Sequence, residues 1–160
     1  MNIIPEVKNR LLYDKTVDLN KIKWSFDEGA DERVVAEAYR ICESFENGFP
    51  IHISMGNKYC EEYIIEIEED NAEILSDGAN GAFYALQTLK QLLNEDGGTV
   101  LCQKICDKPD MKYRGLYHDV SRGKIPTLET LKELADTVAY YKMNSLQLYI
   151  EHTFEFDEYE

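Results

Sequence analysis

The stretch "YRGLYHDVSRGKIP" (113–126) decides the fold of the carboxyl-terminal part of the chain. It begins as an apolar strand, "LYHDVS", passes through a group of polar residues, and opens a helix for which Thr127 is the expected N-cap. The next apolar strand is "SLQLYI" (145–150), and acidic residues follow it. Strand, helix and strand in this order predict a parallel βαβ unit. Apolar strands of this kind are typical of sheets covered on both faces, so two strands alone would be an incomplete sheet.

The residues before this unit predict a separate α+β domain, in which a small sheet carries two helices. Lys108 and Pro109 mark the expected boundary, because the residue before a proline is disfavoured in a helix and proline is excluded from central strands. We therefore expect two domains, residues 1–108 and 109–160. Within the first domain we predict strands at 21–26, 51–55 and 99–107 and a hairpin over 62–77 that turns at Asn71. A first helix is expected to be capped by Asp31 and to run to about Asn47, with Phe45 on its apolar face. A second helix is expected over 81–96, capped by Asp77 or Asn80.

Composition excludes several classes of function. The chain has 160 residues, 44% of them apolar, which is enough for a folded core. A formal charge of −14 repels phosphate backbones and anionic lipids, so we expect neither a nucleic-acid nor a membrane partner. No apolar run approaches the roughly 20 residues that a membrane span needs. The beginning, "MNIIPEVKNRLLYD", lacks the pattern of a secretion signal, which predicts a cytoplasmic protein, or a secreted one if a signal has been trimmed.

The four cysteines predict free thiols rather than disulfides or a metal site. Cys102 and Cys106 share one face of a predicted strand, which places them roughly 13 Å apart at about 3.3 Å per residue. That distance is too long for a disulfide or for two ligands of one metal ion. His52 and His118 lie inside predicted strands, where we expect packed histidines.

"GANGAFYALQTLKQLL" (78–93) is similar to the second helix of the α+β domain that precedes the catalytic barrel in glycoside hydrolase family 20, the β-N-acetylhexosaminidases. "KYRGLYHDVSRGKIP", continued by "YYKMN", resembles the family's Arg-Gly…Asp-x-Ser-Arg strand and the Lys-x-Asn that leads into its second strand. The resemblance implies that residues 109–160 are the truncated start of a (β/α)₈ TIM barrel.

The resemblance also implies the candidate site. Active sites of such barrels lie at the carboxyl ends of the strands, where Asp119, Ser121 and Arg122 follow the first strand and Glu151 and His152 follow the second. Arg122 matches the arginine that hydrogen-bonds the hydroxyls of a terminal N-acetylhexosamine; the alternative is that it merely pairs with Asp119. The other four residues are expected to support the site at the strand ends. Arg114 lies at the opposite end of its strand, where a role in stability is expected.

This sequence departs from the family pattern in two places, which leaves the substrate subclass open. Gly123 stands where the family has histidine after the arginine. The second strand ends in Glu151-His152-Thr153 instead of an Asp pair.

The activity that the resemblance implies is hydrolysis of terminal β-linked N-acetylglucosamine or N-acetylgalactosamine with retention, in which the acetamido oxygen of the substrate is the nucleophile. An adjacent Asp-Glu pair assists, and in the family it follows the fourth barrel strand. This chain has no catalytic residue of that kind, because its acidic clusters, Glu61-Glu62 and Glu68-Glu69-Asp70, precede the barrel and are expected to be solvated. We expect the chain alone to be inactive, and the chemistry needs no metal or cofactor.

Two alternatives remain open: a non-catalytic carbohydrate-binding or interaction module, and a fragment of a family 84-like hydrolase or an α-glucuronidase. In every case the two apolar strands of 109–160 would leave unpaired edges. They are expected to pack on the leading domain, to pair between two copies in a homodimer, or to be partly disordered.

Overall fold

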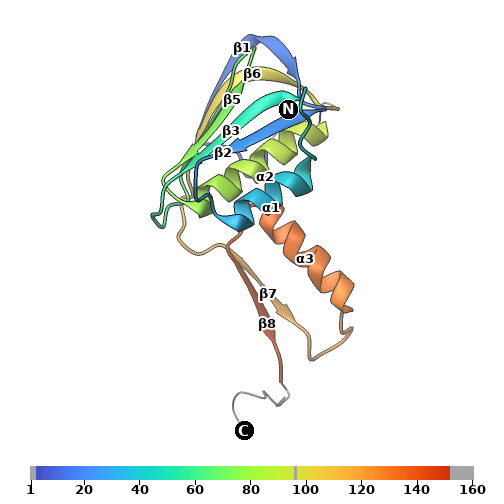
Figure 1. Ribbon diagram of the computed structural model, residues 1–160. Coiled ribbons are helices and arrows are strands. Elements are labelled where there is room, and N and C mark those ends of the chain that lie inside the picture. The colour runs from blue at the N-terminus through green and yellow to red at the C-terminus, as the bar shows by residue number, and fades with distance from the viewer. Residues whose placement is uncertain (1–2, 96, 152–160) are drawn as a thin grey trace. The chain divides into compact units, whose positions relative to one another are not determined.

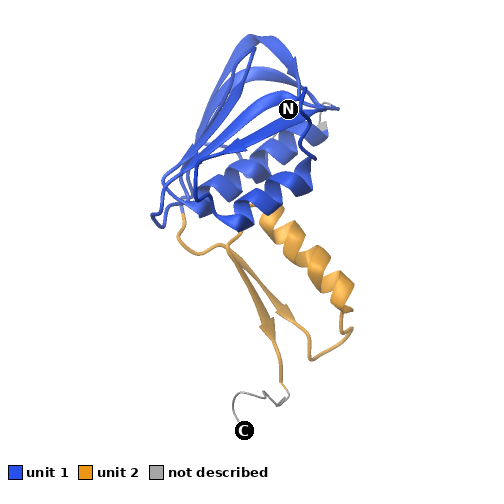
Figure 2. Ribbon diagram, viewed as in Figure 1, with its two compact units in different colours: residues 1–110 blue, residues 111–160 orange. Residues whose placement is uncertain are grey.

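A computed structural model of the chain describes residues 3–95 and 97–151 (Figure 1). The chain forms two compact units, residues 1–110 and 111–160 (Figure 2). The elements within the described residues are, in chain order, β1 (Asn9–Asp18), β2 (Ile22–Phe26), α1 (Glu32–Ile41), β3 (Phe49–Met55), β4 (Tyr63–Ile67), β5 (Ala72–Ser76), α2 (Ala79–Glu95), β6 (Thr99–Asp107), β7 (Gly115–Asp119), α3 (Leu128–Tyr140) and β8 (Ser145–Tyr149).

The first unit is a six-stranded mixed sheet with α1 and α2 on one face (Figure 1). The strand order is β1-β6-β4-β5-β3-β2. β3 runs parallel to both β2 and β5, whereas β4 and β6 pair with their neighbours in antiparallel fashion. The predicted α+β class and the predicted β4–β5 hairpin are confirmed. The parallel β2–β3 pair follows from the chain path, because β2 reaches β3 through α1, which returns the chain to the same end of the sheet.

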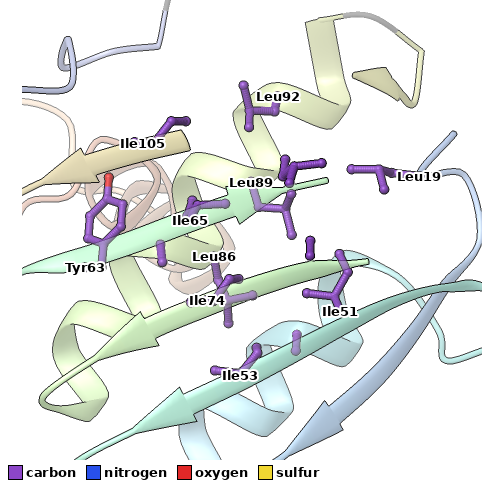
Figure 3. Close-up of a cluster of buried hydrophobic side chains, with 14 of the residues drawn as sticks. Leu19, Ile51, Ile53, Tyr63, Ile65, Ile74, Leu86, Leu89, Leu92 and Ile105 are labelled. Atoms are coloured by element: carbon purple, nitrogen blue, oxygen red, sulfur yellow. The ribbon is translucent and has the colours of Figure 1, made fainter. Parts of the chain in front are cut away.

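The core lies between this sheet and its two helices. Alternate residues of the strands point to the helices, and the successive leucines of α2 point back at them (Figure 3). Each such side chain, when fully buried, stabilises the fold by about 1.5–3 kcal/mol. The largest fully buried side chains are Leu19, Ile22, Ile51, Ile53, Tyr63, Ile65, Ile67, Ile74, Leu86, Leu89, Leu92 and Ile105.

Helix α1 starts as predicted and ends earlier than predicted. The Asp31 side chain accepts a hydrogen bond from the Arg33 backbone N–H at 2.9 Å, which confirms the N-cap. The helix ends at Ile41 rather than near Asn47, because Cys42 is extended and its carbonyl accepts a hydrogen bond from Trp24 Nε1 at 2.9 Å. The prediction that Phe45 belongs to the helical face was therefore wrong.

Two further elements of the first unit differ from expectation. β1 (Asn9–Asp18) was not predicted; it pairs with β6 at the edge of the sheet. α2 begins at Ala79, so Gly78 occupies the position before the helix, where Asp77 or Asn80 was expected. Only glycine fits there, because a Cβ atom at Gly78 would lie 2.0 Å from the Lys58 carbonyl oxygen.

His52 is not the packed histidine that was expected. Its neighbours Ile51 and Ile53 point to the helices, so His52 lies on the opposite face of β3. There its Nδ1 lies 3.0 Å from Ser25 Oγ and its Nε2 lies 3.1 Å from Asp27 Oδ1, with 39% of the side chain exposed. His118, in the second unit, is half-buried.

The second unit contains the predicted βαβ arrangement. β7 and β8 are parallel and are joined through α3, with Gly115 opposite Ser145 and Asp119 opposite Tyr149. Thr127 is the N-cap of α3, as predicted, and its hydroxyl accepts a hydrogen bond from the Thr130 N–H. Within the described part of the chain, this sheet has two strands.

Candidate functional site

The candidate site lies where β7 and β8 end. Because the strands are parallel, their carboxyl ends share one edge of the sheet. Asp119 is the last residue of β7, with Ser121 and Arg122 after it, and Glu151 follows shortly after β8. The structure brings these four predicted residues together. His152 was also predicted and lies outside the described residues.

The Asp119 carboxylate organises the turn after β7. Its Oδ1 accepts hydrogen bonds from the backbone N–H groups of Ser121 at 2.8 Å and Arg122 at 3.2 Å, and its Oδ2 accepts one from Arg122 Nε at 2.8 Å. The Ser121 N–H, and after it the Arg122 guanidinium, lower the pKa of Asp119 below its ordinary value. Asp119 is therefore an ionised anchor for Arg122.

The Arg122 guanidinium contacts the Asp119 side chain at Nε and remains mostly exposed to solvent. Besides Asp119, its neighbours are Glu151, whose Oε1 lies 3.9 Å from Nη1, and the ring of Tyr149, whose centroid lies 5.3 Å from Cζ. The side chain is nevertheless 65% exposed. The pairing with Asp119 that was the alternative to ligand binding does occur, but its hydrogen bond uses Nε, so the terminal nitrogens make no hydrogen bond within the described part of the chain.

Ser121 and Tyr149 connect the two strand ends. Ser121 Oγ accepts a hydrogen bond from the Glu151 backbone N–H at 2.5 Å, and the Val120 N–H donates to the Tyr149 carbonyl at 3.0 Å. The Tyr149 hydroxyl donates to Glu151 Oε1 at 3.0 Å, and this bond raises the pKa of Tyr149. Ser121 thus fixes the position of Glu151 through the backbone, whereas Tyr149 fixes its carboxylate.

Two tyrosines at this edge were not predicted as site residues. Tyr149 lies under Arg122, and its ring centroid is 5.8 Å from that of Tyr117, which is 55% exposed. The register of β7 and β8 is the observation that identifies Tyr149 as a site residue. Tyr149 lies opposite Asp119 in this parallel pair, so the two side chains project from the same face of the sheet. The result is an aromatic surface beside a guanidinium, an arrangement that can bind a hydroxyl-rich ligand with an apolar face.

Arg114 lies at the other end of β7 and ties loops together there. Its Nε donates to the Lys142 carbonyl at 3.0 Å and its Nη1 to the Met111 carbonyl at 2.7 Å. Its backbone N–H donates to Asn144 Oδ1 at 2.9 Å. These contacts agree with the structural role expected for it.

The acidic cluster of the β4–β5 turn and the four cysteines all lie in the first unit. The acidic cluster Glu68-Glu69-Asp70 is exposed in the β4–β5 turn, and Glu69 pairs with Lys15. All four cysteines have free thiols, and burial raises the pKa of Cys102. Among the described residues, no group of three or more His, Cys, Asp or Glu side chains could hold a metal ion. No helix in this part of the chain is long and apolar enough to cross a membrane.

Residues 6–108 match the family model described as glycosyl hydrolase family 20, domain 2. The match covers more than half of the chain, which therefore belongs to glycosyl hydrolase family 20. This confirms the resemblance drawn from the sequence, and the alternatives of a family 84-like hydrolase or an α-glucuronidase are set aside.

Individual proteins are similar to this chain in sequence or in fold. The chain is 37% identical over 91 residues to a beta-hexosaminidase of Akkermansia muciniphila, a match that covers 55% of this chain and 18% of that protein. A beta-N-acetylhexosaminidase of Bacteroides fragilis superposes with a TM-score of 0.77 at 21% identity, over 92% of this chain and 32% of that one. An exo beta-N-acetylglucosaminidase of Vibrio harveyi, solved with N-acetylglucosamine, gives a TM-score of 0.69 at 25% identity, over 91% and 25% of the two chains. This chain thus matches a minor part of each relative.

Proposed function

We propose that this chain is the amino-terminal portion of a β-N-acetylhexosaminidase. In this proposal residues 1–108 form the leading α+β domain, and residues 109–160 form the first strand, helix and strand of a (β/α)₈ barrel. The family match at residues 6–108 and the parallel β7–α3–β8 unit support this division. The four free thiols support a cytoplasmic location, which we propose with it.

The reaction proposed for the whole enzyme is hydrolysis of terminal β-linked N-acetylglucosamine or N-acetylgalactosamine with retention, through attack by the substrate's acetamido oxygen. The assisting Asp-Glu pair would come from a later strand, so the 160-residue chain alone would bind the sugar without hydrolysing it. No metal or cofactor has a role in this reaction.

Arg122 would bind the hydroxyls of the terminal sugar. The observation that carries this assignment is that Asp119 holds Arg122 through Nε at the carboxyl end of β7 while the guanidinium remains mostly exposed. A guanidinium is always charged and donates several parallel hydrogen bonds, which suits vicinal hydroxyls. Tyr149 would keep the guanidinium in place from below.

The test compares hydrolysis of a chromogenic β-N-acetylglucosaminide by this chain and by the native reading frame extended past Glu160. Activity in the longer protein alone supports the proposal, whereas silence in both contradicts it and favours a binding module. In the longer protein, Arg122→Ala should lower kcat/KM by about 10- to 100-fold, since a hydrogen bond to a charged group is worth roughly 1.5–3 kcal/mol. Lys124→Ala, which removes an exposed cation two residues away, is the matched control and should leave kcat/KM unchanged.

A further inference from the structure

A second concave site lies in the first unit, at the carboxyl ends of its parallel strands. The pocket has a volume of about 350 Å³ and is formed by residues that follow β2 and β3 and by the first residues of α2. Sites for small molecules begin at about 300 Å³, so the pocket has room for a sugar ring with its substituents. Gly29 and Asp31 line it after β2, Asn57, Lys58 and Tyr59 after β3, and Asn80 in the first turn of α2.

The floor of this pocket is fixed before any ligand binds. The Gly56 N–H donates to the Ser76 carbonyl and the Lys58 N–H to the Asp77 carbonyl, both at 2.9 Å. Gly78 allows the segment after β5 to approach the segment after β3 this closely, because any Cβ at Gly78 would overlap the Lys58 carbonyl. A preformed surface spares a ligand the cost of ordering the loop.

The pocket offers polar groups that the fold leaves unused. Within the described part of the chain, the side-chain amides of Asn57 and Asn80 make no hydrogen bond to protein, although Asn80 is half-buried. Each amide can both donate and accept, so it can bind a hydroxyl group in either direction. Tyr59 adds an aromatic ring that is 76% exposed, the kind of surface on which the C–H face of a pyranose packs.

The charges around the pocket favour a neutral ligand. Arg33 is paired with Asp31, with Nη2 2.7 Å from Oδ2, and Lys58 is paired with Asp77 at 3.1 Å. Each cation is therefore offset by an anion, so the pocket has no excess charge to attract a phosphate or a carboxylate.

We propose that this pocket is a saccharide-binding site, separate from the Arg122 site, which takes one neutral pyranose residue. Tyr59 packs against the C–H face of the ring, and Asn57 and Asn80 hydrogen-bond its hydroxyls. Such a site holds a glycan without cleaving it, and the inference does not depend on the activity proposed above.

The test is titration of the ¹⁵N-labelled 160-residue chain with N,N′-diacetylchitobiose, with cellobiose and with inorganic phosphate, monitored by amide chemical shifts. We expect one or both sugars, at millimolar concentration, to shift the amides of residues 29–33, 56–60 and 79–81 in a saturable manner. Tyr59→Ala should weaken this binding by roughly tenfold, the equivalent of about 1.4 kcal/mol. Asn80→Ala should weaken it as well, and alanine suits the helical position.

Two control variants separate this proposal from the first. Tyr113→Ala removes a tyrosine that is 77% exposed but lies outside the pocket, and Arg122→Ala removes the arginine of the other site; both should leave the pocket's affinity unchanged. The amide spectrum itself reports whether each variant is folded. The proposal is overturned if sugars shift only residues 115–122 and 149–151 in an Arg122-dependent manner, if phosphate alone shifts the pocket, or if nothing does.

Discussion

Asp31 combines two local roles, and both of them lower the pKa of its carboxyl group. It caps α1 through the Arg33 backbone N–H and also pairs with the Arg33 side chain. The guanidinium, and after it the backbone N–H, lowers the pKa of Asp31 from 3.8 to about 2. A carboxyl group whose pKa is lower in the folded state stabilises the fold above its unfolded pKa, and this contribution is lost as the pH falls toward the folded value.

We therefore expect part of the chain's stability to disappear between about pH 4 and pH 2 because of Asp31. Asp31→Asn keeps a side chain that caps helices well but cannot titrate, so its unfolding free energy should depend less steeply on pH over this range. Asp31→Ala should lose about 1 kcal/mol at neutral pH. Urea unfolding followed by the fluorescence of the single tryptophan, Trp24, measures both effects, and identical pH slopes for wild type and Asp31→Asn would contradict the assignment.

Tyr149 offers a test of how Arg122 is held. In the longer protein proposed above, Tyr149→Ala should lower kcat/KM by about two- to fivefold, because a cation–π contact at an exposed site is worth roughly 0.5–1 kcal/mol. Tyr149→Phe keeps the ring and removes only the hydroxyl that donates to Glu151, so kcat/KM should stay within about twofold. Equal losses in both variants would assign the effect to the hydroxyl instead of the ring.

The candidate site could be predicted only in part from single residues. Asp119, Ser121 and Arg122 are adjacent in sequence, so their proximity follows from the turn after β7. Tyr149 lies beside Arg122 because of the register in which β7 and β8 pair, and the whole of α3 separates these two strands in sequence. Register depends on tertiary pairing, which no short stretch of sequence encodes.

At the scale of elements, α2 contributes most to the core of the first unit. Leu86 is fully buried and faces the strands (Figure 3). Leu86→Ala should lower the free energy of unfolding by about 2–5 kcal/mol, through lost burial and the cavity that remains. Leu11→Ala, at a leucine of β1 that is 58% exposed, is the control and should change it by less than about 0.5 kcal/mol. Similar losses of unfolding free energy in the two variants, measured by urea unfolding, would contradict the assignment of Leu86 of α2 to this core.

The elements that were predicted correctly have a clear burial pattern. β4 and β5 alternate between buried and more exposed residues, which is the period-two signal of a strand with one covered face. β1 has no such pattern, because it lies at an edge, is mostly exposed, and has an irregular register between Leu12 and Thr16. The end of α1 depends on the contact of Cys42 with Trp24, a residue in another element. Local patterns therefore predict covered elements, whereas edges and helix ends depend on partners elsewhere.

At the scale of the whole molecule, the two units differ in how well each covers its apolar surface. Most of the core residues belong to the first unit, whereas Val138 is the one buried apolar residue among the described residues of the second. The second unit instead exposes many apolar side chains for its size: Met111, Tyr113, Leu116, Tyr117, Ile125, Leu128, Tyr141, Met143, Leu148 and Ile150. A two-stranded sheet is marginally stable at best without further packing.

We therefore expect the units to differ in local stability and the second to self-associate. Amide hydrogens of β7 and β8 should exchange much faster than those of β3 and β5, which lie inside the larger sheet. Light scattering should show a mass that rises with concentration, because each strand of the described two-stranded sheet has one edge without a partner strand. Leu148→Lys places a charge on β8 and should shift the chain toward the monomer, whereas Lys124→Ala, outside the strands, should not. A monomer at all concentrations with slowly exchanging β7 and β8 amides would instead mean that this unit completes its packing within one chain.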